Sequence, residues 1–257
     1  MATTIHPTAI VDPSAEIADG VEIGPYCVIY AGVKIGAGTW LQNHVTVDSG
    51  TEIGERNRFF AFGSIGQLTQ DLKYDGGPTY AKIGNDNTFR EFCTVHRATS
   101  ANDATIIGNH GNFLSYSHVA HDCIVGDNVI LSNNGTLGGH VTVGDYAIIS
   151  GLSAVHQFCR IGAHVLTGGC TKIVQDIPPF MIADGNPVRV RAINSVGMQR
   201  RGFTEQQIRC VKKAHRALYR DDKNATDALA IIREIDDPDG VLAGLIDFVS
   251  TTERGLH

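Results

Sequence analysis

Large apolar residues recur at every sixth position along most of this chain. Counting from Ile5 in steps of six, 25 of the 29 positions up to Ile173 hold an aliphatic residue or Phe. The exceptions fall at positions 71, 77, 101 and 167, so the same register resumes after each interruption. This period matches neither an amphipathic helix nor a simple alternating strand, and it is typical of hexapeptide parallel β-helices.

Two further columns of residues share this period. The position after the aliphatic residue is Gly in 11 repeats, and the fifth position of the repeat is mostly small. Four of the six cysteines fall in that fifth column: Cys27, Cys93, Cys123 and Cys159. No C-x-x-C pair is present, so we interpret these cysteines as packing residues inside a crowded bend. Three repeats would form one triangular coil, with successive coils about 4.8 Å apart.

The repeat divides the chain into two expected domains. A β-helix is predicted over residues 1–187, with loops at 66–82 and 98–106 where the repeat fails. Long loops on a rigid scaffold are often functional. From residue 188 to 257 the apolar period becomes helical, which predicts a small C-terminal α-helical domain. Thr204, Thr226 and Asp237-Pro238 are the expected helix starts.

Charge and hydropathy narrow the class of protein. The chain has 21 basic and 27 acidic residues, so nothing in its bulk charge indicates binding to nucleic acid or an anionic membrane. It has no apolar run of the roughly 20 residues that a membrane span needs and no secretory signal pattern, so we expect a cytoplasmic protein. The segment 189–220 carries nine basic residues against one acid. Either a solvated helix face or an anion-handling surface would account for it.

Histidines gather where the coils are expected to stack. Over 107–173 the repeat is uninterrupted, so residues 18 apart occupy the same place on successive coils. His121 then lies beneath Gly139 and Gly139 beneath Gln157, while Asp122 lies beneath His140. His118 shares a coil with His121, and His156 adjoins Gln157.

The residue types in this cluster suit acyl transfer to a hydroxyl. His121 is the candidate general base, because imidazole titrates near neutral pH. Asp122 would fix its tautomer or cap the turn, and the Gly139 N–H could stabilise an oxyanion. Cys123 lies in the packing column, so direct attack by the acceptor is favoured over an acyl-enzyme. Stacked histidines also resemble the zinc site of γ-class carbonic anhydrases, but that family has an H-x-x-x-x-H pair, and we predict no metal here.

Several longer motifs resemble those of UDP-N-acetylglucosamine acyltransferases over essentially the whole chain. They are Gln70-Asp71-Leu72-Lys73-Tyr74, Val95-His96-Arg97, His118-Val-Ala-His121-Asp-Cys, Leu137-Gly-Gly-His140, Ala154-Val-His156-Gln157-Phe, Ile161-Gly-Ala-His164 and Gln199-Arg200-Arg201-Gly-Phe203.

The resemblance implies a left-handed β-helix in a homotrimer with active sites between neighbouring prisms. It implies a 3-hydroxyacyl group donated by acyl carrier protein to the 3-hydroxyl of the UDP-sugar at the start of lipid A biosynthesis, with no cofactor. The implied residues that bind the sugar nucleotide or support His121 are Asp71, Lys73, His118, His140, His156, Gln157, Asn194, Arg200 and Arg201. The basic C-terminal helices would meet the acidic carrier protein.

Substrate details remain open at three positions. Ala98 stands where the family commonly has Gly, a replacement associated with members that accept a 3-amino sugar nucleotide, so the product could be an ester or an amide. Gly168 and Gly169 are small where a bulky side chain would shorten an acyl groove, which favours a longer chain.

Other activities are compatible with the same repeat. They are the later N-acyltransferase of the pathway, an acetyl-CoA-dependent acetyltransferase and a non-catalytic trimerisation scaffold. The histidine cluster and the loop motifs argue against the scaffold.

Overall fold

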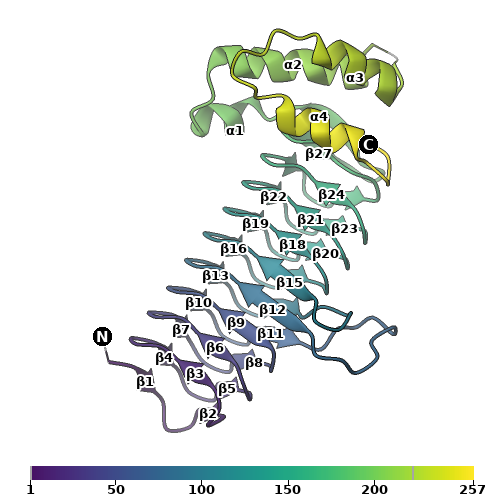
Figure 1. Cartoon of the computed structure of the whole chain (residues 1–257). Helices are drawn as coiled ribbons and strands as arrows, with labels where there is room; N and C mark the ends of the chain where they lie inside the picture. The colour runs from purple at the N-terminus through teal and green to yellow at the C-terminus, as the bar shows by residue number, and fades with distance from the viewer. Residues whose placement is uncertain (1, 222) are drawn as a thin grey trace.

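The computed structural model describes residues 2–221 and 223–257. The chain winds into a long left-handed parallel β-helix, and a helical domain lies at its C-terminal end (Figure 1). Each strand is followed by a turn into the next face of the prism, so every third strand pairs in parallel. The fold class predicted from the six-residue repeat is confirmed.

Three sheets form the faces of the prism, and we name them A, B and C. Sheet A contains β1 (Thr4–Ile5), β4 (Glu22–Ile23), β7 (Trp40–Leu41), β10 (Arg58–Phe59), β13 (Thr88–Phe89), β16 (Asn112–Phe113), β19 (Ile130–Leu131), β22 (Ile148–Ile149), β25 (Leu166–Thr167), β27 (Met181–Asp184) and β28 (Arg189–Ile193). Sheet B contains β2 (Ile10–Val11), β5 (Val28–Ile29), β8 (Thr46–Val47), β11 (Ser64–Gln67), β14 (Thr94–His96), β17 (His118–Val119), β20 (Thr136–Leu137), β23 (Ala154–Val155) and β26 (Lys172–Ile173). Sheet C contains β3 (Glu16–Ile17), β6 (Lys34–Ile35), β9 (Thr51–Ile53), β12 (Tyr80–Ile83), β15 (Ala104–Ile107), β18 (Ile124–Val125), β21 (Thr142–Val143) and β24 (Arg160–Ile161).

The aliphatic column of the repeat fills the interior of the prism. Three phenylalanines stack through its middle, with ring centroids 4.8 Å apart for Phe59 and Phe89 and 4.5 Å for Phe89 and Phe113. All three are buried. A single coil could not cover these side chains, so the core exists only because coils stack.

The corners of the prism share one backbone conformation. One turn position of the repeat takes φ near +60°, including Asp122 (60°) and His140 (60°). This left-handed conformation is unfavourable for residues other than glycine. Because it recurs at structural corners as well, it belongs to the scaffold and is not strain particular to Asp122 and His140.

Two excursions leave the prism, and both are shorter than predicted. β11 runs to Gln67 and β12 begins at Tyr80, so the loop predicted at 66–82 spans 68–79. Because β15 begins at Ala104, the loop predicted at 98–106 spans 97–103. Paired strands extend beyond the repeat and shorten each loop.

The lengths of the excursions explain why the repeat keeps its register. Strand partners lie 18 residues apart on plain coils (Asn112 and Ile130), but 30 apart across the first excursion and 24 across the second. The excursions therefore add 30 − 18 = 12 and 24 − 18 = 6 residues, which are whole multiples of the repeat.

The β-structure continues past the boundary predicted at residue 187. β27 pairs in parallel with β25, and β28 then turns back as an antiparallel partner of β27. The helices follow as α1 (Ser195–Arg200), α2 (Glu205–Tyr219), α3 (Ala225–Arg233) and α4 (Ala243–Ser250).

The helix starts agree with the sequence at one of three places. Thr204 caps α2, and its hydroxyl accepts the N–H of Gln207 in a capping box, as predicted. The predicted start at Thr226 is wrong, because the side chain of Asn224 caps α3 two residues earlier. Asp237-Pro238 does not begin a helix; Asp237 accepts N–H groups in the turn before α4.

Candidate active site

The corner between sheets B and C, named here the B–C corner, carries most of the predicted site. Its successive turns hold His121 with Asp122, then Gly139 with His140, then His156 with Gln157 and Phe158. The predicted stacking of these turns is present: the His140 N–H donates to the His121 carbonyl, and the Phe158 N–H to the Gly139 carbonyl, both at 3.0 Å.

His121 and Asp122 form a hydrogen-bonded pair. The Nδ1 of His121 lies 2.7 Å from an Asp122 carboxylate oxygen, and both side chains are largely buried. Burial opposes ionisation of Asp122, but hydrogen bonds from His121 and Thr99 outweigh it and lower the pKa of this carboxyl. An ionised Asp122 accepts a hydrogen bond from the Nδ1–H of His121. This tautomer leaves Nε2 as the basic nitrogen.

Thr99 contacts both members of this pair, and no sequence pattern pointed to it. Its N–H donates to both Asp122 oxygens, at 3.1 and 3.2 Å, and its hydroxyl lies 3.1 Å from His121 Nδ1. The Thr99 hydroxyl also lies 2.8 Å from that of Thr69, which accepts the N–H of Asp71 at 3.1 Å. Both excursions are thus connected to the His121–Asp122 pair through hydroxyl groups.

Gly139 leaves room for the His121 ring. A Cβ atom at this position would collide with the imidazole, so only glycine permits the observed packing. Within the described part of the chain, the Gly139 N–H has no hydrogen-bond acceptor.

A comparison with another corner shows what this N–H can bind. At the same turn position between sheets C and A, the N–H of Asn109 donates to the Asp127 carboxylate, and that of Asp127 to the Asp145 carboxylate. One coil above Gly139 the equivalent residue is Gln157, and no such bond is made. The turn therefore orients an N–H toward an anionic oxygen, and at Gly139 that place is open.

His140 closes the other side of the cluster. Its ring stands perpendicular to that of His121, with centroids 5.3 Å apart, and stacks on Phe158 at 4.6 Å. Its Nε2 lies 3.6 Å from Asp122. The ring is therefore held between His121 and an aromatic face.

His118 and His96 form a second pair of neighbouring side chains. The Nδ1 of His118 lies 2.7 Å from the Thr94 hydroxyl, and its ring meets His96 edge-on at 4.9 Å. The pKa of His118 is lowered mainly by burial and also by the nearby His121. Burial and the two neighbouring histidines lower the pKa of His96 to about 4, so His96 is neutral at pH 7.

Cys123 has no catalytic character. Burial raises the pKa of its thiol to about 12, and the thiol donates to the Gly138 carbonyl. A protonated, enclosed thiol is a poor nucleophile, in agreement with its assignment to packing.

The first excursion brings Asp71 and Lys73 to the B–C corner. With Thr99, His140 and Phe158 they line a hollow of about 380 Å³. Asp71, His121 and His140 each offer a ligand atom, and these atoms lie within 4.8 Å of one another. Within the described residues, this is the only such group of three that could hold a metal ion. Two imidazoles and one carboxylate are donors that suit zinc.

His156 and Gln157 are exposed at the top of this corner. The His156 Nδ1 lies 3.0 Å from the Gln157 carbonyl and 3.3 Å from the Arg254 guanidinium. Arg254 belongs to the C-terminal tail and was not singled out from the sequence.

Asn194, Arg200 and Arg201 lie elsewhere on the same chain. With Tyr146 and His164 they line a hollow of about 320 Å³ at the corner between sheets C and A. The Asn194 amide caps α1 and donates to the His164 carbonyl, and Arg201 lies over the Tyr146 ring at 4.3 Å. A single chain does not bring these residues to the His121 cluster.

Gly168 and Gly169 lie at the third corner, between β25 and β26, and they differ in their surroundings. A Cβ at Gly168 would collide with the side chain of the exposed Asp184, which would have to move. A Cβ at Gly169 would meet only the Gly151 carbonyl oxygen, at 3.6 Å. A side chain is therefore accommodated more easily at Gly169 than at Gly168.

Ala98 is fully buried in the second excursion. Its N–H donates to the Tyr80 carbonyl at 3.1 Å, and the next residue is Thr99. Within one chain, its methyl group can affect the site by shifting Thr99.

The basic segment of the C-terminal domain forms a cleft of about 720 Å³ between β28 and α2. Six cationic residues line it: Arg191, Arg209, Lys212, Lys213, Arg216 and Arg220. Ala192, Ile193 and the buried His215 also line it. An acidic surface with some apolar area would complement it.

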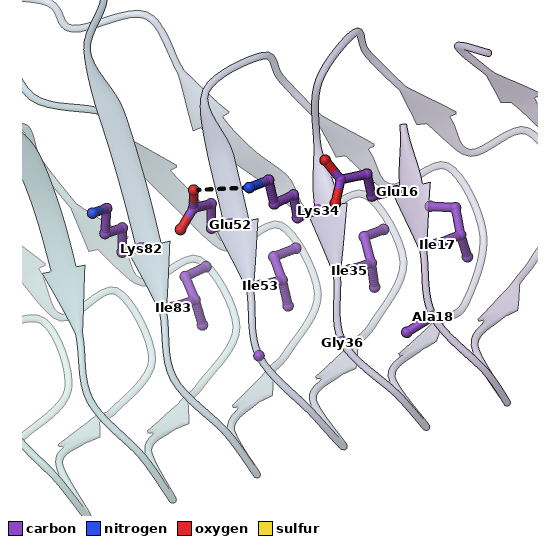
Figure 2. Close-up of a pocket in the computed structure, with 11 residues that line it drawn as sticks. Glu16, Ile17, Ala18, Lys34, Ile35, Gly36, Glu52, Ile53, Lys82 and Ile83 are labelled. Carbon is purple, nitrogen blue, oxygen red and sulfur yellow. Dashed lines mark ion pairs between the residues drawn. The ribbon is translucent and has the colours of Figure 1, made fainter. Parts of the chain in front are cut away.

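A hollow of about 600 Å³ over the first coils of sheet C has a different character (Figure 2). Glu16, Lys34, Glu52 and Lys82 alternate in charge on neighbouring strands, and Lys34 pairs with Glu52 at 3.8 Å. The hollow contains no histidine, and such a ladder stabilises the pairing of strands.

No helix among the described residues is both long enough and apolar enough to cross a bilayer.

Known proteins resemble the chain over nearly its whole length. Residues 2–37 match the bacterial transferase hexapeptide family, and residues 176–257 match the second domain of UDP N-acetylglucosamine O-acyltransferase. Two proteins named acyl-[acyl-carrier-protein]–UDP-N-acetylglucosamine O-acyltransferase are similar. The one from Thiobacillus denitrificans is 45% identical and the one from Thermodesulfovibrio yellowstonii 46%, each alignment covering 98% of both chains.

Solved structures agree with these relatives. The UDP-N-acetylglucosamine O-acyltransferase of Moraxella catarrhalis superposes with a TM-score of 0.95 at 41% identity, covering 98% of both chains. The enzyme of Bacteroides fragilis gives 0.96 at 35% identity, covering 99% of this chain and all of that one. The chain therefore belongs to the acyl-[acyl-carrier-protein]–UDP-N-acetylglucosamine O-acyltransferase family.

Proposed function

We propose that this chain transfers a 3-hydroxyacyl group from acyl carrier protein to the 3-position of UDP-N-acetylglucosamine, the first step of lipid A biosynthesis. The observation that supports this most directly is the His121–Asp122 pair packed against Gly139, whose N–H is free. A base and an oxyanion donor on adjacent coils are the two groups that acyl transfer to a hydroxyl requires.

The proposed reaction needs no covalent enzyme intermediate. Nε2 of His121 takes the proton of the sugar 3-hydroxyl while the hydroxyl oxygen attacks the thioester carbonyl carbon. The Gly139 N–H stabilises the resulting oxyanion. The C–S bond then breaks, and the thiolate of the carrier's prosthetic arm takes the proton from His121. Asp122 stabilises the imidazolium during these steps.

The residues around His121 would hold the sugar nucleotide. Lys73 suits its negative charge, and Asp71 and His140 line the same hollow. His118, His156 and Gln157 lie on the same or the next coils and complete the binding surface.

The distribution of the site over the prism favours a homotrimer. His121, Arg200 and Gly169 lie at three different corners, so one chain cannot present all three to one substrate. A second copy placing its C–A corner against the B–C corner would supply Arg200 and Arg201 to the sugar nucleotide. A groove between copies would also let the acyl chain reach Gly169.

The cleft between β28 and α2 is the proposed docking surface for acyl carrier protein. Its six cations face solvent beside a single acid, Asp221. Association at this surface should weaken as salt is raised.

The acceptor's 3-substituent is the finer part of the proposal. The ester is the main expectation. Ala98 keeps the 3-amino acceptor as the alternative, because a methyl group beside Thr99 could alter the position of the His121–Asp122 pair.

The test is product analysis with purified 3-hydroxyacyl carrier proteins of several chain lengths. Each donor is combined with UDP-N-acetylglucosamine and with its 3-amino analogue. His121→Ala should lose activity by orders of magnitude, whereas His6→Ala, which removes an exposed histidine from the first coil, should not. Ester formation supports the main proposal, and amide formation alone supports the alternative acceptor. No product from either acceptor would refute both.

A further inference from the structure

The C-terminal tail is fixed to the top of the prism beside the B–C corner. The buried Asp176 donates its N–H to the Gly255 carbonyl at 2.9 Å, and its carboxylate accepts the Thr252 hydroxyl at 2.8 Å. Nε2 of His257 accepts the N–H groups of Val174 and Gln175, at 3.2 and 3.0 Å. Contacts of both backbone and side chain thus place residues 251–257 against the last coil.

This anchoring brings Arg254 to His156. One guanidinium nitrogen of Arg254, Nη2, lies 3.3 Å from the Val174 carbonyl oxygen and 3.3 Å from Nδ1 of His156. The nitrogen carries two hydrogens, so it can donate to both partners.

His156 therefore has two neighbours that demand opposite tautomers. The Gln157 carbonyl, 3.0 Å from Nδ1, requires a proton on Nδ1. Arginine can only donate, so Arg254 requires Nδ1 to be an acceptor and places the proton on Nε2. The partner that Nδ1 takes decides whether Nε2 offers an N–H or a lone pair to a ligand.

We propose that Arg254 is a positioning residue that selects the Nε2–H tautomer of His156, so that His156 donates a hydrogen bond to the sugar nucleotide. The guanidinium contact, at 3.3 Å, is longer than the 3.0 Å contact to the carbonyl, but the guanidinium is charged and the carbonyl is neutral, and on this ground the proposal gives Nδ1 to Arg254. A donor is what the ligand needs, because a diphosphate and the carbonyl groups of a nucleotide are acceptors. The inference rests on the proposed function, in which His156 contacts the sugar nucleotide.

Without Arg254, the imidazole proton would lie on Nδ1, where it bonds to the Gln157 carbonyl. Nε2 would then present a lone pair to an anionic ligand. Arg254→Ala should therefore raise the KM for the sugar nucleotide about tenfold, the effect of one hydrogen bond to a charged group, with little change in the KM for the acyl carrier protein. Arg254→Lys, which keeps a donor, should restore part of the loss. Glu253→Ala changes the exposed neighbouring residue and is the matched control.

A tautomer measurement separates this role from a structural one. In protein labelled with ¹⁵N-histidine, the nitrogen shifts of His156, assigned with His156→Ala, should report Nε2–H in the wild type and Nδ1–H in Arg254→Ala. His156→Ala should raise the same KM, and adding Arg254→Ala to it should have no further effect.

The outcomes distinguish the inference from the function beneath it. If His156→Ala impairs the enzyme while Arg254→Ala keeps the wild-type tautomer and KM, the inference is refuted and the proposed function stands. Additive losses in the double variant would likewise refute it. Wild-type kinetics in His156→Ala would remove His156 from the proposed binding surface, and the role of Arg254 with it.

Discussion

The role of Asp122 can be tested by a substitution that keeps its shape. Asp122 accepts from His121 Nδ1 and, with both oxygens, from the Thr99 N–H. In Asp122→Asn only one oxygen remains. When that oxygen stays with the Thr99 N–H, the amide NH₂ faces His121 and donates to Nδ1, which forces the imidazole proton onto Nε2. Nε2 is then no longer a base.

The size of the effect follows from the step that is lost. General base catalysis contributes about 10²- to 10⁴-fold, which corresponds to about 3–5 kcal/mol at 1.36 kcal/mol for each tenfold. We expect a loss of kcat in this range with a small change in KM, because the carboxylate lies behind His121. His121→Ala should be about as inactive, and the double variant no worse than either single one.

The assay is ester formation from 3-hydroxyacyl carrier protein and UDP-N-acetylglucosamine at saturating concentrations. Asp12→Asn is the matched control, because Asp12 also accepts a turn N–H at a prism corner but lies on the first coil, far from His121. Thermal unfolding of both variants checks that the fold is intact. A kcat for Asp122→Asn within a few-fold of the Asp12→Asn value would refute the proposed tautomer control.

Three further predictions concern the same scaffold. Gly139→Ala should reduce kcat at least tenfold, because the new methyl group collides with His121; wild-type kcat would contradict this packing. Phe113→Ala should lower the free energy of unfolding by about 3–5 kcal/mol in urea titrations, and a loss below about 1 kcal/mol would contradict its place in the stacked core. The pKa of His96 is about 4 when folded against 6.5 for the free group, so the unfolded chain binds more protons between these values and stability falls as pH drops. His96→Asn should therefore lose about 2 kcal/mol less than the wild type between pH 7 and pH 5, and equal losses in urea titrations at the two pH values would contradict it.

The cluster of residues around His121 could be predicted because the scaffold is periodic. Once residues 18 apart are known to stack, the neighbours of His121 follow from simple addition, and Gly139 and His140 are found where that sum places them. Thr99 was missed because it lies in an excursion, where the repeat no longer relates sequence to position. Arg254 was missed because it lies 98 residues from its partner His156 in the chain, on a tail outside the repeat.

Local signals were less reliable outside the prism. Thr204 and Asn224 both cap helices, but Thr226 is also a residue type that caps, and the sequence does not reveal that Asn224 takes this place. The excursions are shorter than the gaps in the repeat because β11, β12 and β15 continue pairing beyond their apolar residues.

The sequence by itself determined the coils, their register and the residues stacked at the B–C corner. It could do so because each aliphatic residue is buried only against the coils above and below, so a repeat of fixed length leaves one arrangement that covers them. The tertiary structure alone decided which groups lie within hydrogen-bond distance of His121 and His156, and it placed Arg200 and Gly169 at other corners. These depend on where loops, hairpin and tail pack against the prism, and the contacts that hold them join residues far apart in the chain without any period.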